Sequence, residues 1–150
     1  MTCKDYETAL KGIIVRPELQ PSNGVTHCNA FLQAVAHLFN IKDFDGLMAN
    51  QIFDLLEANP TKYPKQTDVT SNGYMRLAKD AFADPAKFIV AAQKDTMHGH
   101  VCVVAPTGGT SQSGHWNKVV CNVANVGKTV FYNKGLNFAF SVEPTLYDIV

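Results

Sequence analysis

The feature that most constrains the fold of this chain is a change of pattern at Pro85. Before Pro85, apolar residues recur at three- and four-residue steps, which is typical of amphipathic helices. After it, short runs rich in β-branched and aromatic residues alternate with glycine and polar clusters, which is typical of antiparallel strands. Helices followed by a sheet predict an α+β domain. The 150 residues suit a single domain, 1–150, with one core.

Local patterns give approximate bounds for these elements. The strongest helix is expected over residues 28–39, with Thr26 as its N-cap. Further helices are expected over residues 3–11, 46–58 and 73–82. Strands are expected over residues 87–93, 99–105, 119–124, 128–132 and 136–142, with a flexible Gly/Ser/Thr loop at 107–114.

Composition argues against several classes of partner. Lys and Arg number 13 and so do Asp and Glu, a balance that does not favour binding to nucleic acid. No stretch reaches the roughly 20 apolar residues that a membrane helix needs. Residues 1–10 carry Lys4, Asp5 and Glu7 where a signal peptide would have an apolar core. We therefore expect no nucleic-acid or membrane partner and no Sec-dependent export.

Cys28 is the first candidate for chemistry. It lies in the first turn of the helix expected at 28–39, where free backbone N–H groups and the helix dipole favour a thiolate, the nucleophilic form of cysteine. The alternative is that Cys28 is a small buried apolar residue. The chain has 4 cysteines without a Cys-x-x-Cys pair, so we expect no zinc site and no cofactor.

His100 is the second candidate, as a general base or as a structural residue. It opens the run 100–104, where alternation puts His100 on one face and Val101 on the other. His37 lies nine residues after Cys28, on the opposite side of that helix, and cannot serve the thiol. His115 and Trp116 follow the expected loop and either line a cleft or merely end the loop.

Two stretches resemble a known family. Residues 28–36, Cys-Asn-Ala-Phe-Leu-Gln-Ala-Val-Ala, resemble the Cys-Ser-Gly-Phe-Val-Gln helix that carries the nucleophile in NlpC-type cell-wall cysteine peptidases. Residues 88–92 and 99–104 resemble the paired strands of that family, whose Gly-His-Val holds the catalytic histidine. A weaker similarity spans 121–141. Within this superfamily the chain is most similar to the type VI secretion amidase effectors and the CHAP amidases.

The resemblance implies a papain-like fold, with N-terminal helices packed on an antiparallel sheet of about five strands, and assigns roles to residues. Cys28 is the implied nucleophile and His100 the implied base. A third polar group on the next strand should orient the imidazole, and Cys121 or Asn122 occupies that place. We expect the backbone carbonyl of Cys121 to act there. Beside these catalytic residues, the expected substrate-binding residues are Asn29, His115 and Trp116.

The implied function is hydrolysis of amide bonds in peptidoglycan stem peptides, such as the bond between D-glutamate and diaminopimelate. An antibacterial effector of this kind would reach the periplasm or cell wall of target bacteria without a Sec signal, and an immunity or inhibitor protein would be its partner. The alternatives are a phage endolysin or deamidating toxin of the same fold, or a non-catalytic binding module in which Cys28 and His100 are structural.

Overall fold

Four helices form the first half of the chain, as the sequence predicts. The computed structural model describes residues 1–149. The helices α1–α4 span Cys3–Ile14, Cys28–Leu38, Ala49–Ala58 and Ser71–Ala83, and two short 3-10 turns, η1 and η2, span Pro17–Leu19 and Leu136–Phe138. Helix α1 begins with a reciprocal cap between Thr2 and Asp5, which satisfies backbone N–H groups that would otherwise lack partners. Helix α2 begins after His27, without a side-chain cap, so Thr26 is not the N-cap.

The second half of the chain forms an antiparallel sheet of six strands. The strands β1–β6 span Phe88–Gln93, His100–Val104, Thr110–Ser113, Lys118–Val126, Val130–Gly135 and Thr145–Ile149. Their order is β3-β4-β2-β1-β6, and β5 also pairs with β4. The α+β class and the pairing of β1 with β2 are therefore confirmed.

Three strands differ from the sequence prediction, and one of them is β6, Thr145–Ile149, which lies outside every predicted strand. Residues 136–142, predicted as a strand, begin with the turn η2 and contain no strand. Strand β3 lies inside the predicted loop: its sequence Thr-Ser-Gln-Ser carries no apolar pattern, but it pairs with residues 118–121 of β4. Since β3 lies at one end of the strand order, it needs apolar residues less than a central strand does.

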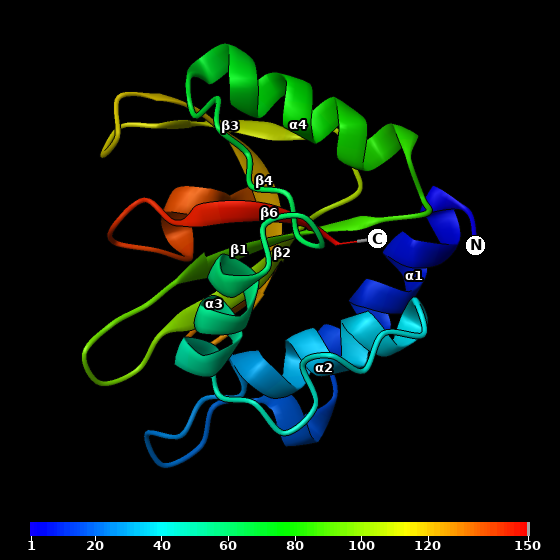
Figure 1. Cartoon of the computed structure of the whole chain (residues 1–150), viewed down its shortest axis with the longest axis vertical. Helices are drawn as coiled ribbons and strands as arrows, with labels where there is room; N and C mark the ends of the chain where they lie inside the picture. The colour runs from blue at the N-terminus through cyan, green and yellow to red at the C-terminus, as the bar shows by residue number, and fades with distance from the viewer. Residues whose placement is uncertain (150) are drawn as a thin grey trace.

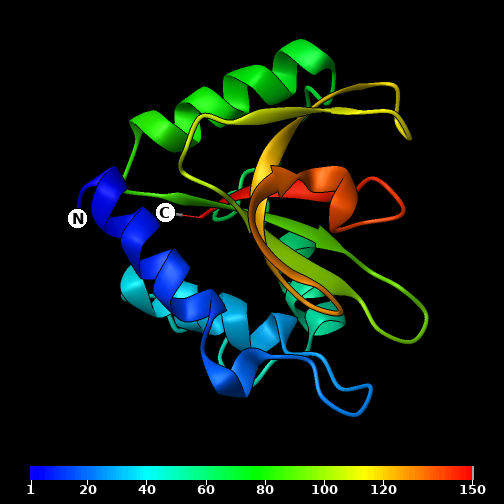
Figure 2. The same ribbon diagram turned by 180° about the vertical axis from the view of Figure 1, so that it is seen from behind.

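The sheet separates two layers of helices. Helix α4 covers one face, and α1, α2 and α3 lie on the other (Figure 1; seen from behind in Figure 2). Buried residues accordingly form two clusters, and β2 contributes to both: Val101 belongs to the α1–α3 cluster and Cys102 to the α4 cluster. The alternation expected for residues 100–104 is therefore present.

Two loops project from the same side of the molecule, the segment before α2 and the connection between β1 and β2 (Figures 1 and 2). Asn50 of α3 holds the second loop, because its side-chain N–H donates to the Asp95 carbonyl at 2.7 Å and its Oδ1 accepts from the Asp95 N–H at 3.1 Å. Any side chain at Gly99 would collide with Asn50. The loop is thus fixed beside the N-terminus of α3.

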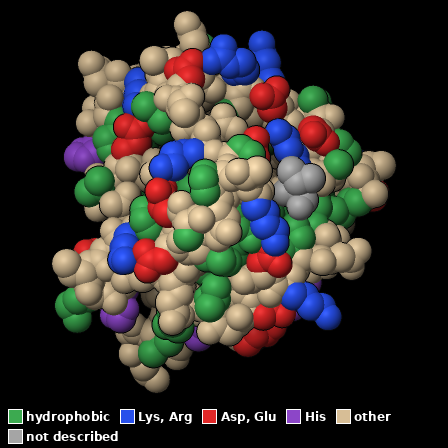
Figure 3. All heavy atoms as spheres, in the orientation of Figure 1, with side chains coloured by type: hydrophobic (Ala, Val, Ile, Leu, Met, Phe, Trp, Pro, Cys, Tyr) green, Lys and Arg blue, Asp and Glu red, His purple; other side chains and the backbone are tan. Residues whose placement is uncertain are grey.

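Charges of both signs are interspersed over the face shown in Figure 3. Within residues 1–149, no helix has the length and apolar character needed to cross a membrane.

Candidate active site

Cys28 is the first residue of α2 and is only 6% exposed. Burial raises the pKa of its thiol above the ordinary value. The backbone N–H groups of Val101, Asn29 and Cys28 itself interact with the sulfur and act in the opposite direction, but burial has the larger effect. The helix terminus therefore does not produce the lowered pKa expected from the sequence, and the resting thiol is protonated at neutral pH.

His100, the first residue of β2, is hydrogen-bonded to a buried amide. Its Nε2 lies 2.6 Å from Oδ1 of Asn125, which is 2% exposed. The side-chain N–H of Asn125 donates to the carbonyl of Thr129 at 2.9 Å, and a carbonyl can only accept. Oδ1 of Asn125 must therefore face the ring, so Nε2 carries the hydrogen. In the neutral imidazole this leaves the lone pair on Nδ1.

Two further contacts fix the His100 ring. The centroid of the Phe140 ring lies 5.0 Å from that of His100, at an interplanar angle of 59°. On another side, a Cβ added to Gly127 would lie 2.9 Å from Cε1 of His100, so the ring needs glycine at this position. Burial lowers the pKa of His100, and the hydrogen bond to Asn125 opposes this effect only in part. The ring is therefore a neutral base at neutral pH.

Cys28 and His100 both lie at the start of β2. The interaction of the Val101 N–H with the thiol places Cys28 within one residue of His100 along the backbone. Cys28 belongs to the α1–α3 cluster and His100 packs on Phe140 of the α4 cluster, so the two side chains approach the strand from opposite faces. Among residues 1–149, no hydrogen bond joins the thiol to the ring.

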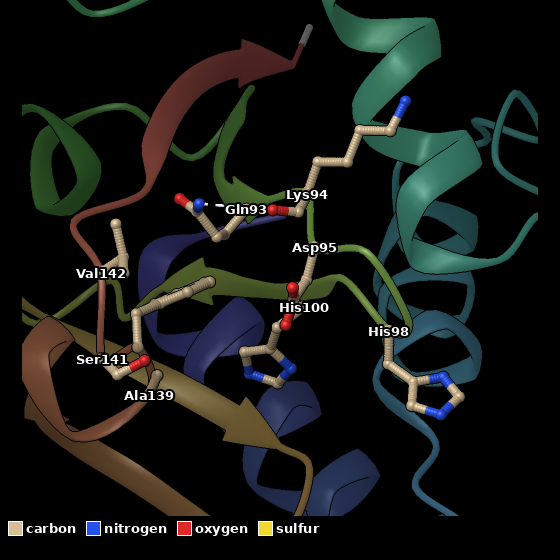
Figure 4. Close-up of a pocket in the computed structure, with 9 residues that line it drawn as sticks. Gln93, Lys94, Asp95, His98, His100, Ala139, Ser141 and Val142 are labelled. Carbon is tan, nitrogen blue, oxygen red and sulfur yellow. Dashed lines mark hydrogen bonds between the residues drawn. The ribbon is translucent and has the colours of Figure 1, made fainter.

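The two side chains line adjoining pockets. The pocket at Cys28 has a volume of about 520 Å³, and the pocket at His100 about 210 Å³. His98 lines both and so marks their boundary. Figure 4 shows the His100 pocket, with the His98 ring turned away from that of His100. A substrate could therefore contact Cys28 and His100 at once by lying across the boundary.

The side chain hydrogen-bonded to His100 is that of Asn125, and neither Cys121 nor Asn122 takes this place. Val103 pairs with Ala124, and the Ala105 N–H donates to the Asn122 carbonyl, so Cys121 lies far along β4 from His100. The prediction placed the end of this strand at residue 124, whereas β4 continues to Val126. The available signal for Asn125 was its place as the second of two asparagines in the otherwise apolar run 119–126, and only the first of them, Asn122, is among the candidates predicted from the sequence.

The predicted substrate-binding residues divide between two places. Asn29 lines the Cys28 pocket, but its side-chain N–H donates to the Leu47 carbonyl at 3.2 Å. His115 and Trp116 lie in the connection between β3 and β4, at the opposite end of β4 from Asn125. They line neither the Cys28 nor the His100 pocket, so the structure does not bring them to this site.

Within residues 1–149, no group of three or more His, Cys, Asp or Glu side chains is arranged to hold a metal ion, and all 4 cysteines are free. No protein-family model matches the chain, and no curated protein shows significant similarity to it.

Proposed function

We propose that this chain is a papain-like cysteine hydrolase of the NlpC type that cleaves amide bonds, with Cys28 as nucleophile, His100 as general base and Asn125 as the residue that orients His100. The observation that carries the proposal is the hydrogen bond between His100 and Asn125. It fixes the ring in the tautomer that leaves Nδ1 free to accept a proton, and the thiol of Cys28 interacts with the next backbone N–H of the same strand.

The protonation states define the first step. Nδ1 of His100 accepts the proton of Cys28 as the sulfur attacks the amide carbonyl carbon, so a thiolate forms only during attack. Backbone N–H groups at the start of α2, including that of Cys28, stabilise the negative charge that develops on the carbonyl oxygen. The carbon–nitrogen bond then breaks, His100 donates its proton to the departing amine, and a thioester to Cys28 remains.

Water completes the cycle. It attacks the thioester carbon and gives a proton to His100, the carbon–sulfur bond breaks, and the sulfur of Cys28 regains its proton. Asn125 accepts the hydrogen bond from Nε2 throughout, and this interaction stabilises the imidazolium that forms transiently.

Peptidoglycan stem peptides are the proposed substrate, on the resemblance of residues 28–36 and 99–104 to cell-wall peptidases. Delivery to the periplasm or cell wall of target bacteria and control by an immunity or inhibitor protein belong to the same proposal. A second candidate is a binding module without catalysis. Two observations favour it: the raised pKa of the Cys28 thiol, and the lack of a hydrogen bond between Cys28 and His100.

Digestion of purified Gram-negative sacculi, followed by mass analysis of the released muropeptides, tests the proposal. Wild-type protein should release fragments cut at an amide bond, and Cys28→Ala should release none. Cys3→Ala is the matched control, because Cys3 lies in α1, outside both pockets, and should leave cleavage unchanged. Failure of the wild-type protein to cut, or normal cutting by Cys28→Ala, would overturn the assignment and favour the binding module.

A further inference from the structure

If the chain hydrolyses amides as proposed above, the two pockets contact different halves of the substrate. After attack, the acyl half is bonded to Cys28, while the amine half leaves with the proton from His100. The acyl half must therefore occupy the pocket at Cys28, and the amine half the pocket at His100.

The Cys28 pocket presents apolar side chains from three separate segments. Val25 comes from the loop before α2, Met48 from the residue before α3, and Met97 from the connection between β1 and β2. Their exposed fractions are 55%, 60% and 79%. Single exposed apolar side chains are common on protein surfaces, but several that line one cavity are typical of a ligand-binding groove. The pocket volume of about 520 Å³ lies within the range of small-molecule sites.

Among residues 1–149, no Lys, Arg, Asp or Glu lines the Cys28 pocket. Its two asparagines are engaged within the protein, since Asn29 donates to the Leu47 carbonyl and Asn50 exchanges two hydrogen bonds with the backbone of Asp95. Thr26 and His98 are the lining side chains left to donate a hydrogen bond, and neither carries a permanent positive charge that would pair with the carboxylate of a glutamyl residue. Burying an unpaired carboxylate is costly. His98, at the boundary, is the one titratable side chain besides Cys28 among the lining residues.

The His100 pocket has a more polar lining, although Ala139, Phe140 and Val142 also contribute to it. Gln93, Lys94, Asp95 and Ser141 line it together with His100 (Figure 4). The Lys94 ammonium is paired with Asp54 on α3 at 2.8 Å and points away from the His100 ring (Figure 4), so the pocket offers a carboxylate and several hydrogen-bonding atoms. The amine half of the substrate can therefore be polar or charged.

We propose that the Cys28 pocket is the acyl subsite, that it selects an uncharged apolar acyl residue, and that Met97 is a specificity-determining residue there. In a stem peptide, alanine is the acyl residue that meets this requirement, whereas D-glutamate and diaminopimelate carry charges. The expected cut then follows an alanine, which differs from the glutamyl bond that the family resemblance suggests.

The test uses the full chain and a series of N-acetyl peptide amides with one fluorogenic amine and alanine, leucine, glutamate or lysine as the acyl residue. Wild-type protein should hydrolyse the leucine or alanine member with a kcat/KM at least about tenfold above the glutamate member. Met97→Lys places a cation in the pocket and should lower this ratio by about tenfold. Met75→Lys is the matched control, because Met75 lies on α4 and lines neither pocket, and its ratio should equal that of wild type.

Sacculi provide a second measurement, because the masses of the muropeptides identify the acyl residue at the cut. Cleavage that depends on Cys28 but follows glutamate, or a ratio that Met97→Lys leaves unchanged, would overturn the acyl-subsite proposal alone. Absence of Cys28-dependent hydrolysis from both the amide series and sacculi would overturn the proposed function, and the subsite with it.

Discussion

Strand β4 carries two buried asparagines, Asn122 and Asn125, whose surroundings differ in one decisive respect. Oδ1 of Asn122 accepts from the Ser111 hydroxyl at 2.5 Å, and its N–H donates to Oδ1 of Asn133 at 3.1 Å. None of these partners can change its charge near neutral pH. Asn125 instead faces the imidazole of His100. The chemistry of the hydrogen-bond partner therefore decides whether a buried side-chain amide only stabilises the fold or belongs to a candidate active site.

The same contrast separates two cysteines. Burial raises the pKa of Cys121, beside Asn122, to about 12. Burial also raises the pKa of Cys28, but Cys28 adjoins a pocket and the backbone next to a histidine. Both thiols are protonated at rest, so contact with a pocket and nearness to His100 along the backbone distinguish Cys28 from Cys121, and the thiol pKa alone does not.

The largest expected effect comes from the candidate nucleophile and base. Cys28→Ala and His100→Ala should each lower kcat by more than about a hundredfold, and the double variant should be no worse, because the two residues act as one unit. Turnover of sacculi and circular dichroism would be measured together. Cys121→Ala, when folded, should retain most of the activity. Equal loss in folded Cys121→Ala and His100→Ala would abolish the distinction between the two cysteines.

The next effect compares the two asparagines directly. Asn125→Ala should lower kcat by roughly tenfold to a hundredfold, because the His100 ring loses the acceptor that fixes its tautomer. Asn122→Ala should cost about 1–3 kcal/mol of unfolding free energy, because partners are left unpaired, with little change in kcat. Asn125→Asp should restore part of the activity and raise the pKa seen in the pH profile. Similar kinetic losses in both alanine variants would contradict the account.

A smaller effect is expected at Gly127. Gly127→Ala adds a Cβ against Cε1 of His100 and should displace the ring, lowering kcat by about tenfold. Gly114→Ala is the matched control, because no atom lies within 4 Å of a Cβ added there, and it should retain the wild-type kcat. Steady-state kinetics of the two variants would show whether catalysis depends on the packing of the His100 ring against Gly127. An unchanged kcat in Gly127→Ala would contradict that dependence.

The smallest effect concerns pH. The lowered pKa of His100 means that kcat/KM should fall on the acid side only below the ordinary histidine value of about 6.5. The unfolding free energy should also decrease as the pH falls. The contribution of neutral His100 to stability is complete above the pKa of histidine in the unfolded chain and is lost as the pH falls through the lower pKa of His100 in the folded protein. Denaturant titrations of wild type and His100→Gln would isolate this contribution, and an acid limb above pH 6.5 would contradict the assignment.

Local patterns could predict the helices and the candidate dyad, but they could not predict its third member. The apolar repeat of residues 28–39 locates α2 to within one residue, because amphipathic periodicity is local. The position of Asn125 beside His100 depends on the register of β4 against β2. It also depends on an irregularity between Val123 and Ala124 in the pairing of β4 with β5. Pairing between distant segments is set by packing, which no local pattern records.

The same limit applies to predicting which segments of the second half form strands and which form turns. Strand β3 is polar and at the edge of the sheet, so its sequence resembles a loop until its partner β4 is known. Residues 136–142 contain five apolar side chains in seven positions, yet they begin with the turn η2 and contribute Phe140 to the surroundings of His100. Of these two segments, residues 136–142 contribute to the candidate site through Phe140, whereas β3 lines neither the Cys28 nor the His100 pocket.

The central claim is that Cys28 reacts through His100, and iodoacetamide labelling at neutral pH, quantified for each cysteine by peptide mass analysis, tests it most directly. Cys102 and Cys121 are fully buried and provide internal controls, and Cys3 provides a more accessible one. The account predicts that Cys28 is labelled faster than Cys3 despite its burial, and that His100→Ala slows labelling of Cys28 but not of Cys3. Labelling of Cys28 as slow as that of Cys102 and Cys121 in the wild-type protein, or a rate that His100→Ala does not change, would contradict it.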